Sequence, residues 1–290
     1  MTVSFKTHLA GLLVVLFSPA AVAMNVFACE PEWAVLARSL GGSAVQVVTL
    51  GDQTPAFRPR PGGFAAVRAT DLVVCSRDAR PGSGLLRLLQ RSDNRGALPG
   101  EPGFFNPRDS IPAGGAAGAS ATRDPAIHLD PRNIMRVARS LTGRLVVLDP
   151  DNAEIYKRGA LAFFHRWRAA MSKWEAQARP LRDTAVVLDR PDWQHLSNWL
   201  GLRPLGPLQH RAAVPPSLHR LSRLLEQATD QPDAIVIQTA HAPQQASAWL
   251  ANRASLRIAH LPDSVNPADD EPLITLFYTL IERLSNPQTQ

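Results

Sequence analysis

Two cysteines are the side chains whose type and placement suggest a specific chemistry. Cys29 and Cys75 each end a short apolar run that we expect to form a strand. The first and third strands of a doubly wound sheet are neighbours, so the two sulfurs could form a disulfide. Such a bridge would close a loop of about 45 residues and stabilise the fold by about 3 to 4 kcal/mol. Two buried thiols are an equally good interpretation, and two cysteines are too few for a cysteine-based zinc site.

Carboxylates cluster most closely at Asp269, Asp270 and Glu271. Such a run can attract a cation, but it is also typical of a solvated loop that precedes the first turn of a helix. The sequence lacks the motifs of dinucleotide-binding loops, phosphate-binding loops, serine hydrolases and zinc proteases. We therefore expect a protein that is not an enzyme.

The elements that must position these groups alternate between strand and helix in the first half of the chain. Strands are predicted at residues 25–29, 45–50 and 71–75, and helices at 32–40, 64–69 and 82–91. This alternation is typical of a parallel sheet with crossover helices. Residues 93–123 are rich in Gly, Pro, Ala and Ser and predict a long flexible loop.

The middle of the chain contains the strongest helix pattern. Asp130 is a natural N-cap and Pro131 suits the first turn of a helix that runs to about Leu141, after which residues 144–148 predict a strand. A much longer helix is expected from residue 152 to about 178, because aromatic residues and alanines recur there at spacings of three and four. It should be roughly 40 Å long, enough to run alongside two lobes.

The second half repeats the α/β alternation. Strands are predicted at residues 184–188, 234–238 and 257–260, and helices at 192–200, 216–229, 243–252 and 271–284. We therefore predict two α/β lobes with doubly wound parallel sheets, at residues 24–149 and 181–290. A long helix at 150–180 joins them, and a cleft lies between them.

The N-terminus indicates the compartment. Lys6, an apolar run at residues 9–17 and the small residues 21–23 follow the order of a secretory signal peptide, here residues 1–23. The apolar run is too short for a membrane span, and no Cys follows the predicted cleavage site, so we expect a periplasmic protein without a lipid anchor. The formal net charge is +6, but the basic residues are scattered, which favours a solvated surface over binding of nucleic acid.

Several short segments are each weak evidence of a relationship to other proteins, but their order along the chain is more specific. They are residues 29–33, 69–75, 124–133, 148–153, 193–202, 248–250 and 261–265. Their order resembles that of the solute-binding proteins that supply zinc and manganese to bacterial ABC importers. The resemblance implies a two-lobed protein with little hinge motion, because the connecting helix is stiff. It also implies zinc or manganese as the ligand and a cognate ABC permease in the inner membrane as the partner; we expect a monomer.

The resemblance also shows that the family's metal ligands are missing. The family pattern Asn/Asp-Pro-His-x-x-x-Asp-Pro-Arg-Asn carries a His ligand where this chain has Ala126. The first His ligand corresponds to Pro55 or Ala56, the third to Arg190, and an acidic fourth ligand to Asp269, Asp270 or Glu271, the first two being preferred. A methyl group and a pyrrolidine ring offer no lone pair, and a guanidinium repels a dication. We therefore expect an altered or lost metal site.

Other side chains could rebuild a site. If the resemblance holds, His128, Asp189 and His241 lie near the cleft ends of predicted strands, and imidazoles and carboxylates bind zinc. Such residues are more often hydrogen-bonded structural groups. We also predict that Arg190, which is costly to leave unpaired in a cleft, forms an ion pair with the acidic run at residues 269–271.

Three functions remain open from the sequence. The chain could be the solute-binding component of a metal-type importer with an altered site. It could be a periplasmic binding or interaction module that keeps the fold without transport, for example an anion binder that uses Arg58, Arg60 and Arg190. The third alternative is a degenerate paralogue.

Overall fold

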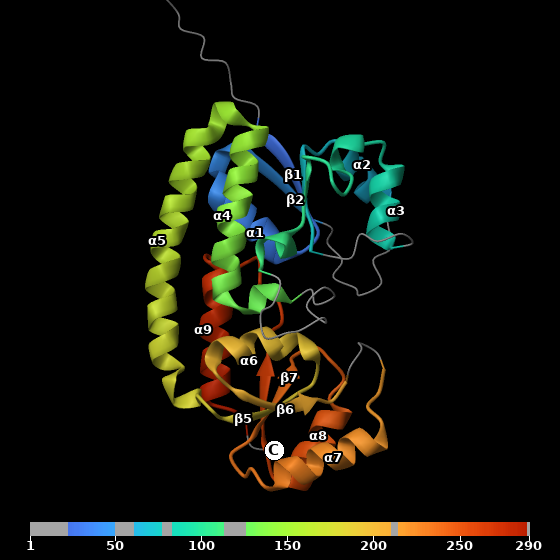
Figure 1. Ribbon diagram of the computed structural model, residues 1–290, viewed down its shortest axis with the longest axis vertical. Helices are drawn as coiled ribbons and strands as arrows, with labels where there is room; N and C mark the ends of the chain where they lie inside the picture. Colours follow the sequence, from blue (N-terminus) through green and yellow to red (C-terminus); the bar gives the residue numbers. More distant parts are fainter. Residues whose placement is uncertain (1–22, 50–60, 77–82, 113–125, 210–213, 289–290) are drawn as a thin grey trace, which may run out of the picture.

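The computed structural model describes residues 23–49, 61–76, 83–112, 126–209 and 214–288. Each half of the chain forms a four-stranded parallel sheet, in the orders β2-β1-β3-β4 and β6-β5-β7-β8. The sheets belong to two lobes, one above the other in Figure 1. This strand order is typical of doubly wound α/β folds, so the predicted fold class is confirmed. The predicted signal peptide lies outside the described residues except for Ala23.

The first lobe is built from residues before the long helix. Its elements are β1 (Met24–Ala28), α1 (Pro31–Gly41), β2 (Val45–Thr49), α2 (Pro61–Arg68), β3 (Leu72–Val74), α3 (Gly84–Arg91), β4 (Phe104–Phe105) and α4 (Pro131–Leu148). Successive strand residues point to opposite faces. Val26 and Ala28 therefore face the core that contains α1 and α4, whereas Phe27 and Cys29 pack with α2 and α3.

Two expectations for this lobe were wrong. Residues 144–148 are the last turns of α4 rather than a strand. Leu141 and Leu145 are fully buried while Val147 is 74% exposed, which is a helical pattern of burial. The predicted loop at residues 93–123 contains the edge strand β4 and two short 3-10 helices, Arg95–Ala97 and Pro107–Ser110. Residues 113–125 lie outside the described part of the chain.

The long helix α5 (Ala153–Gln177) has 25 residues and runs beside both lobes in Figure 1. It is about 37 Å long at the usual rise per residue. Its buried face consists of Tyr156, Ala160, Phe163, Trp167, Ala170 and Trp174. The predicted helix and its aromatic face are confirmed.

The second lobe follows α5. Its elements are β5 (Ala185–Leu188), α6 (Gln194–Leu200), β6 (Arg203–Pro207), α7 (Leu218–Thr229), β7 (Ile235–Thr239), α8 (Gln245–Ala254), β8 (Arg257–Leu261) and α9 (Pro272–Ser285). The sequence did not predict β6, which contains two prolines and a glycine. Proline is tolerated at the edge of a sheet, where its missing N–H costs no ladder bond.

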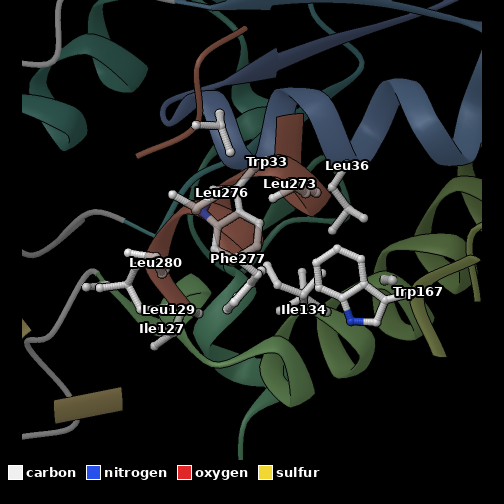
Figure 2. Close-up of a cluster of buried hydrophobic side chains, with 14 of the residues drawn as sticks. Trp33, Leu36, Ile127, Leu129, Ile134, Trp167, Leu273, Leu276, Phe277 and Leu280 are labelled. Carbon is white, nitrogen blue, oxygen red and sulfur yellow. The ribbon is translucent and has the colours of Figure 1, made fainter. Parts of the chain in front are cut away.

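One hydrophobic core extends through both lobes. Helix α9 packs against α5 and also against α1 of the first lobe. Figure 2 shows Trp33 and Leu36 of α1 close to Leu273 and Phe277 of α9, with Trp167 of α5 nearby. The ring centroids of Phe277 and Trp167 are 5.7 Å apart. The two lobes are thus packed against each other and not only connected by α5. Within the described residues, no helix is both long and apolar enough to cross a membrane.

Candidate functional site

The two lobes contact each other at the segment that follows β8. Ser264 donates a hydrogen bond from Oγ to Oε1 of Glu32 on α1, over 2.5 Å. His128 Nε2 lies 2.9 Å from the backbone oxygen of Asp263 and 3.8 Å from Glu32 Oε1. A carbonyl oxygen only accepts, so Nε2 of His128 carries the proton and donates it. We call Glu32, His128, Asp263 and Ser264 the lobe bridge.

The turn before α4 holds His128 in place. His128 lies in the 3-10 helix η5 (Ile127–Leu129), whose backbone is fixed by a hydrogen bond from Asn133 Nδ2 to the oxygen of Ile127, over 3.1 Å. Asp130 then caps α4 by accepting from the backbone N–H of Arg132 over 2.9 Å. Trp33 meets the His128 ring edge-on at 6.3 Å between centroids. The imidazole is therefore a positioned, buried group.

Arg190 forms its ion pairs within the second lobe. One guanidinium nitrogen lies 2.8 Å from Asp263 Oδ2 and 3.6 Å from Asp192 Oδ2. Burial works against the charged form, but the charge of Asp192 and the hydrogen bond to Asp263 outweigh it, so the pKa of Arg190 is raised above its ordinary value. Arg190 stays a cation, and Asp263 links it to the lobe bridge.

The predicted ion pair of Arg190 with the acidic run at residues 269–271 was wrong. Glu271 instead lies 3.2 Å from Arg166 of α5, and Asp269 accepts a hydrogen bond from Asn266 over 3.0 Å. The acidic run directly precedes α9, which packs on α5. Asp263 follows β8 at the same end of the sheet as Arg190, which follows β5, and this topology decides the partner.

Truncating Arg190 should destabilise the fold. Arg190→Ala leaves Asp263 without its cation, and we expect the free energy of unfolding in urea to fall by about 1 to 2 kcal/mol. The expected loss of unfolding free energy is modest because the Asp263 side chain is 38% exposed and solvent screens its interaction with Arg190. The matched control is Arg166→Ala, which removes a pair with exposures of 50% and 52% and should cost less than about 0.5 kcal/mol. Equal losses in the two variants would contradict a special role for Arg190.

Asp189 is a structural carboxylate. Its Oδ1 accepts from Trp193 Nε1 over 2.8 Å, and its Oδ2 accepts from the backbone N–H of Thr239 over 2.7 Å. Burial raises the pKa of Asp189, although these hydrogen bonds oppose the rise. Both oxygens are used to join β5 to the end of β7 and to the 3-10 helix Pro191–Trp193. Asp189 is therefore committed to the fold rather than to a ligand.

Among the residues that the structure describes, the other predicted site residues do not bring ligand atoms to a common point. Ala126 is 6% exposed and contributes only a methyl group. His241 and Asp270 are exposed, and Pro55 lies outside the described residues. Within those residues, His128, Asp189 and His241 do not form a group of ligand atoms close enough to hold one ion. Among the described residues, these side chains therefore do not provide the several imidazole, thiolate or carboxylate donors around one centre that zinc requires.

The structure resolves the alternatives for the cysteines. Cys29 and Cys75 form a disulfide with 5.0 Å between their Cα atoms. They follow β1 and β3, which are paired with Ala28 opposite Val74. The bridge thus joins the ends of two neighbouring parallel strands.

The sequence did not predict that Glu32, Asp263 and Ser264 take part in one set of contacts between the lobes. All three lie in segments that carry the family resemblance, at residues 29–33 and 261–265. A usable signal was present for Asp263, because this carboxylate follows a predicted strand closely, as Arg190 does. Glu32 lies in the first turn of α1, where a carboxylate is common because it interacts favourably with the helix dipole, so its type gives no signal of a contact with the other lobe.

The architecture and these segments agree with one protein family. Residues 26–285 match the family described as zinc-uptake complex component A, periplasmic. The chain belongs to this family. Members of the zinc-uptake family are periplasmic solute-binding proteins, a class without enzymatic activity, which agrees with the expectation from the sequence.

Individual relatives of the zinc-uptake family are distant. The manganese-binding lipoprotein MntA of Halalkalibacterium halodurans is 23% identical over 203 residues, which cover 68% of this chain and 64% of that protein. A crystal structure of ZnuA superposes with a TM-score of 0.75 at 18% identity, covering 91% of this chain and 99% of that one. The manganese-bound periplasmic metal-binding protein of Candidatus Liberibacter asiaticus gives 0.72 at 16% identity, covering 90% and 99%. At such identities the solved structures bear on the fold alone.

Proposed function

We propose that this member of the zinc-uptake family is the periplasmic binding component of a metal-type ABC importer in which a direct bridge between the lobes has replaced the inherited metal site. The observation that carries the proposal is the lobe bridge. Glu32 and His128 of the first lobe bond directly to Ser264 and Asp263 of the second. In this arrangement the lobes are held together by protein groups and need no ion.

Electrostatics support the loss of the inherited site. The resemblance assigns Arg190 to the family's third ligand position, and a dication 4 Å from its guanidinium would meet a repulsion of about 8 kcal/mol at an effective dielectric near 20. Binding would require Arg190 to leave Asp263, with which it makes a 2.8 Å contact. Ala126 would supply no ligand in return. The carboxylate oxygens near Arg190 are poor substitutes for the imidazoles that zinc prefers.

The same proposal includes the route to the periplasm and the partner. We propose that residues 1–23 are removed as a signal peptide and that the mature chain acts as a monomer with a cognate inner-membrane permease. This rests on the order of charged, apolar and small residues at the N-terminus and on family membership.

A second function has its own support. The lobes share a core and are bonded to each other without a ligand, so the chain could serve as a permanently closed interaction module in the periplasm rather than as a carrier. A carrier must release its ligand, and a bridge that never opens would prevent this. Measurements of Zn²⁺ and Mn²⁺ binding to the native protein distinguish a carrier from an interaction module.

We expect the purified mature protein, with its disulfide intact, to bind Zn²⁺ and Mn²⁺ with a dissociation constant weaker than about 1 µM, because the imidazole ligands are missing. Isothermal titration calorimetry without reductant measures this directly. The control variants are His128→Ala and Asp270→Ala, which should leave the weak binding unchanged. Sub-micromolar binding that a chelator reverses would overturn the loss of the site. If both variants retained such binding, its ligands would lie elsewhere in the chain.

A further inference from the structure

A set of metal-ligating groups lies at the ends of β1 and β3, apart from the lobe bridge. Cys29, Glu30 and Cys75 are the only group of at least three His, Cys, Asp or Glu residues in the described part of the chain whose ligand atoms all lie within 4.8 Å of one another. In the oxidised protein the two sulfurs are bonded to each other. We propose that reduction of this disulfide opens a binding site for a soft divalent cation of the zinc class, with two thiolates and the Glu30 carboxylate as ligands.

The backbone already holds the two cysteines close enough for both sulfurs to bind one ion. The Cα atoms of Cys29 and Cys75 are 5.0 Å apart, and both side chains pack into the same cluster on one face of the sheet. Two thiolates on one zinc ion lie about 3.8 Å apart, given metal–sulfur distances near 2.3 Å in a tetrahedral site. The sulfurs of a disulfide are separated by about 2 Å. Small side-chain rotations therefore suffice, and the strands do not need to move.

Glu30 completes a three-ligand set. Its Oε2 accepts from the backbone N–H of Ser76 over 3.2 Å, and Ser76 Oγ in turn accepts from Trp33 Nε1 over 3.2 Å. These contacts fix the carboxylate beside the cysteines, as outer hydrogen bonds do in established metal sites. Three protein ligands leave a fourth position for water, which is typical of zinc sites that exchange their bound group.

Charge explains why the reduced site would favour a cation. Cys29 and Cys75 are 5% and 0% exposed, so two thiolates and a carboxylate would place three negative charges in a largely buried space. Burying this much uncompensated charge is unfavourable. A soft dication neutralises two of the charges and prefers thiolate ligands. The partly exposed Glu30 marks the side from which an ion would arrive.

The chemical step is balanced by a dithiol reductant. It donates two electrons and two protons, the bond between the two Sγ atoms breaks, and the reductant leaves as a disulfide. The cation then binds the two sulfurs and displaces their protons to solvent. This site does not depend on whether the inherited site is lost, because it uses different residues and exists only after reduction.

The test compares oxidised and reduced protein. The chain is reduced with a phosphine, which becomes a phosphine oxide with oxygen from water, and is then desalted without oxygen and titrated with Cd²⁺. We expect one Cd²⁺ to bind with a dissociation constant below about 1 µM and with the ultraviolet absorption of cadmium–thiolate bonds. Oxidised protein should show neither. Zn²⁺ should displace Cd²⁺ at higher concentration.

Variants separate this site from other thiols. Glu30→Gln should weaken Cd²⁺ binding about 10- to 100-fold and keep the thiolate absorption, as expected for loss of one supporting ligand. Cys75→Ser should abolish the absorption. The control is Glu101→Gln, which changes an exposed carboxylate of the same lobe and should leave Cd²⁺ affinity unchanged.

Near-ultraviolet circular dichroism of the tryptophans reports whether the reduced chain is folded. The proposal is overturned if reduced, folded protein binds no Cd²⁺, if the reduced chain unfolds, or if affinity is the same in urea and insensitive to Glu30→Gln. In the last case the thiols of the unfolded chain bind Cd²⁺, and no folded site is needed. None of these outcomes bears on the inherited site, which is tested on oxidised protein.

Discussion

Replacing Ala126 and Arg190 together by His is expected to raise the zinc affinity of the oxidised protein at least about 1,000-fold, which corresponds to about 4 kcal/mol. The double substitution supplies two imidazoles at the positions that we infer, from the resemblance, to correspond to family ligands. It also removes the guanidinium that lies 2.8 Å from Asp263, so this carboxylate becomes available to the ion. Calorimetry with Zn²⁺ under oxidising conditions measures the change.

The matched control for this variant also introduces two His residues in place of one Ala and one Arg. Ala176→His with Arg203→His does so at two exposed positions on α5 and β6, and it should leave zinc affinity unchanged. Adding Pro55→His to the first pair should give a further gain if the resemblance places that residue correctly. An unchanged affinity in the Ala126 and Arg190 double variant would mean that the two segments no longer converge on one point.

The Phe277→Ala variant is expected to lose about 3 to 5 kcal/mol of unfolding free energy, the usual cost of removing a fully buried aromatic ring. Phe277 is 0% exposed, and its ring centroid lies 4.9 Å from that of Trp174 and 5.4 Å from that of Trp199. It therefore fills the space between α9, α5 and α6. Urea unfolding followed by tryptophan fluorescence measures the loss.

Leu161→Ala is the control, because Leu161 is 70% exposed on α5 and should change stability by less than about 0.5 kcal/mol. We also expect the native protein to unfold in a single transition, since the lobes share one core. Similar losses in both variants, or two separate transitions in the native protein, would contradict the shared core.

The parts of the fold that the sequence predicted are those with continuous apolar signals. Strands β1, β3, β5, β7 and β8 are buried and consist mainly of apolar residues, many of them β-branched, as is usual in parallel sheets. The long helix was evident from its aromatic spacing. These signals are local, so a window of the sequence contains them entirely.

Two of the four edge strands, β4 and β6, were missed because their identity depends on a partner. Residues 203–207 include two prolines and a glycine, and they form β6 only by pairing with β5. Residues 104–105 form β4 beside β3 within a stretch whose composition predicts a loop. The end of α4 was misassigned because Leu145, Val146, Val147 and Leu148 have the composition of a strand. Packing against α5 decides in favour of the helix.

For the candidate site, the resemblance led to the prediction that ligands are missing, but the sequence did not predict the contacts that Arg190 makes. Ala126 and Arg190 could be read from motif positions alone. The partner of Arg190 could not, because Asp263 and the acidic run at residues 269–271 are similar in charge and close in sequence. Only the position of Asp263 at the end of β8 brings it to Arg190, and that position is set by the strand order of the sheet.

The meeting of α1 and α9 has a consequence for how the chain acquires its structure. The central core contains Met24 near one end of the described chain and Leu284 near the other. A polypeptide that emerges from its N-terminus therefore cannot complete the packing of its first helix until its last helix is available. Such long-range contacts slow folding, because distant segments must meet before either is stabilised. Removal of α9 should leave an apolar surface on α1 and α5 that aggregates, rather than a shorter folded protein.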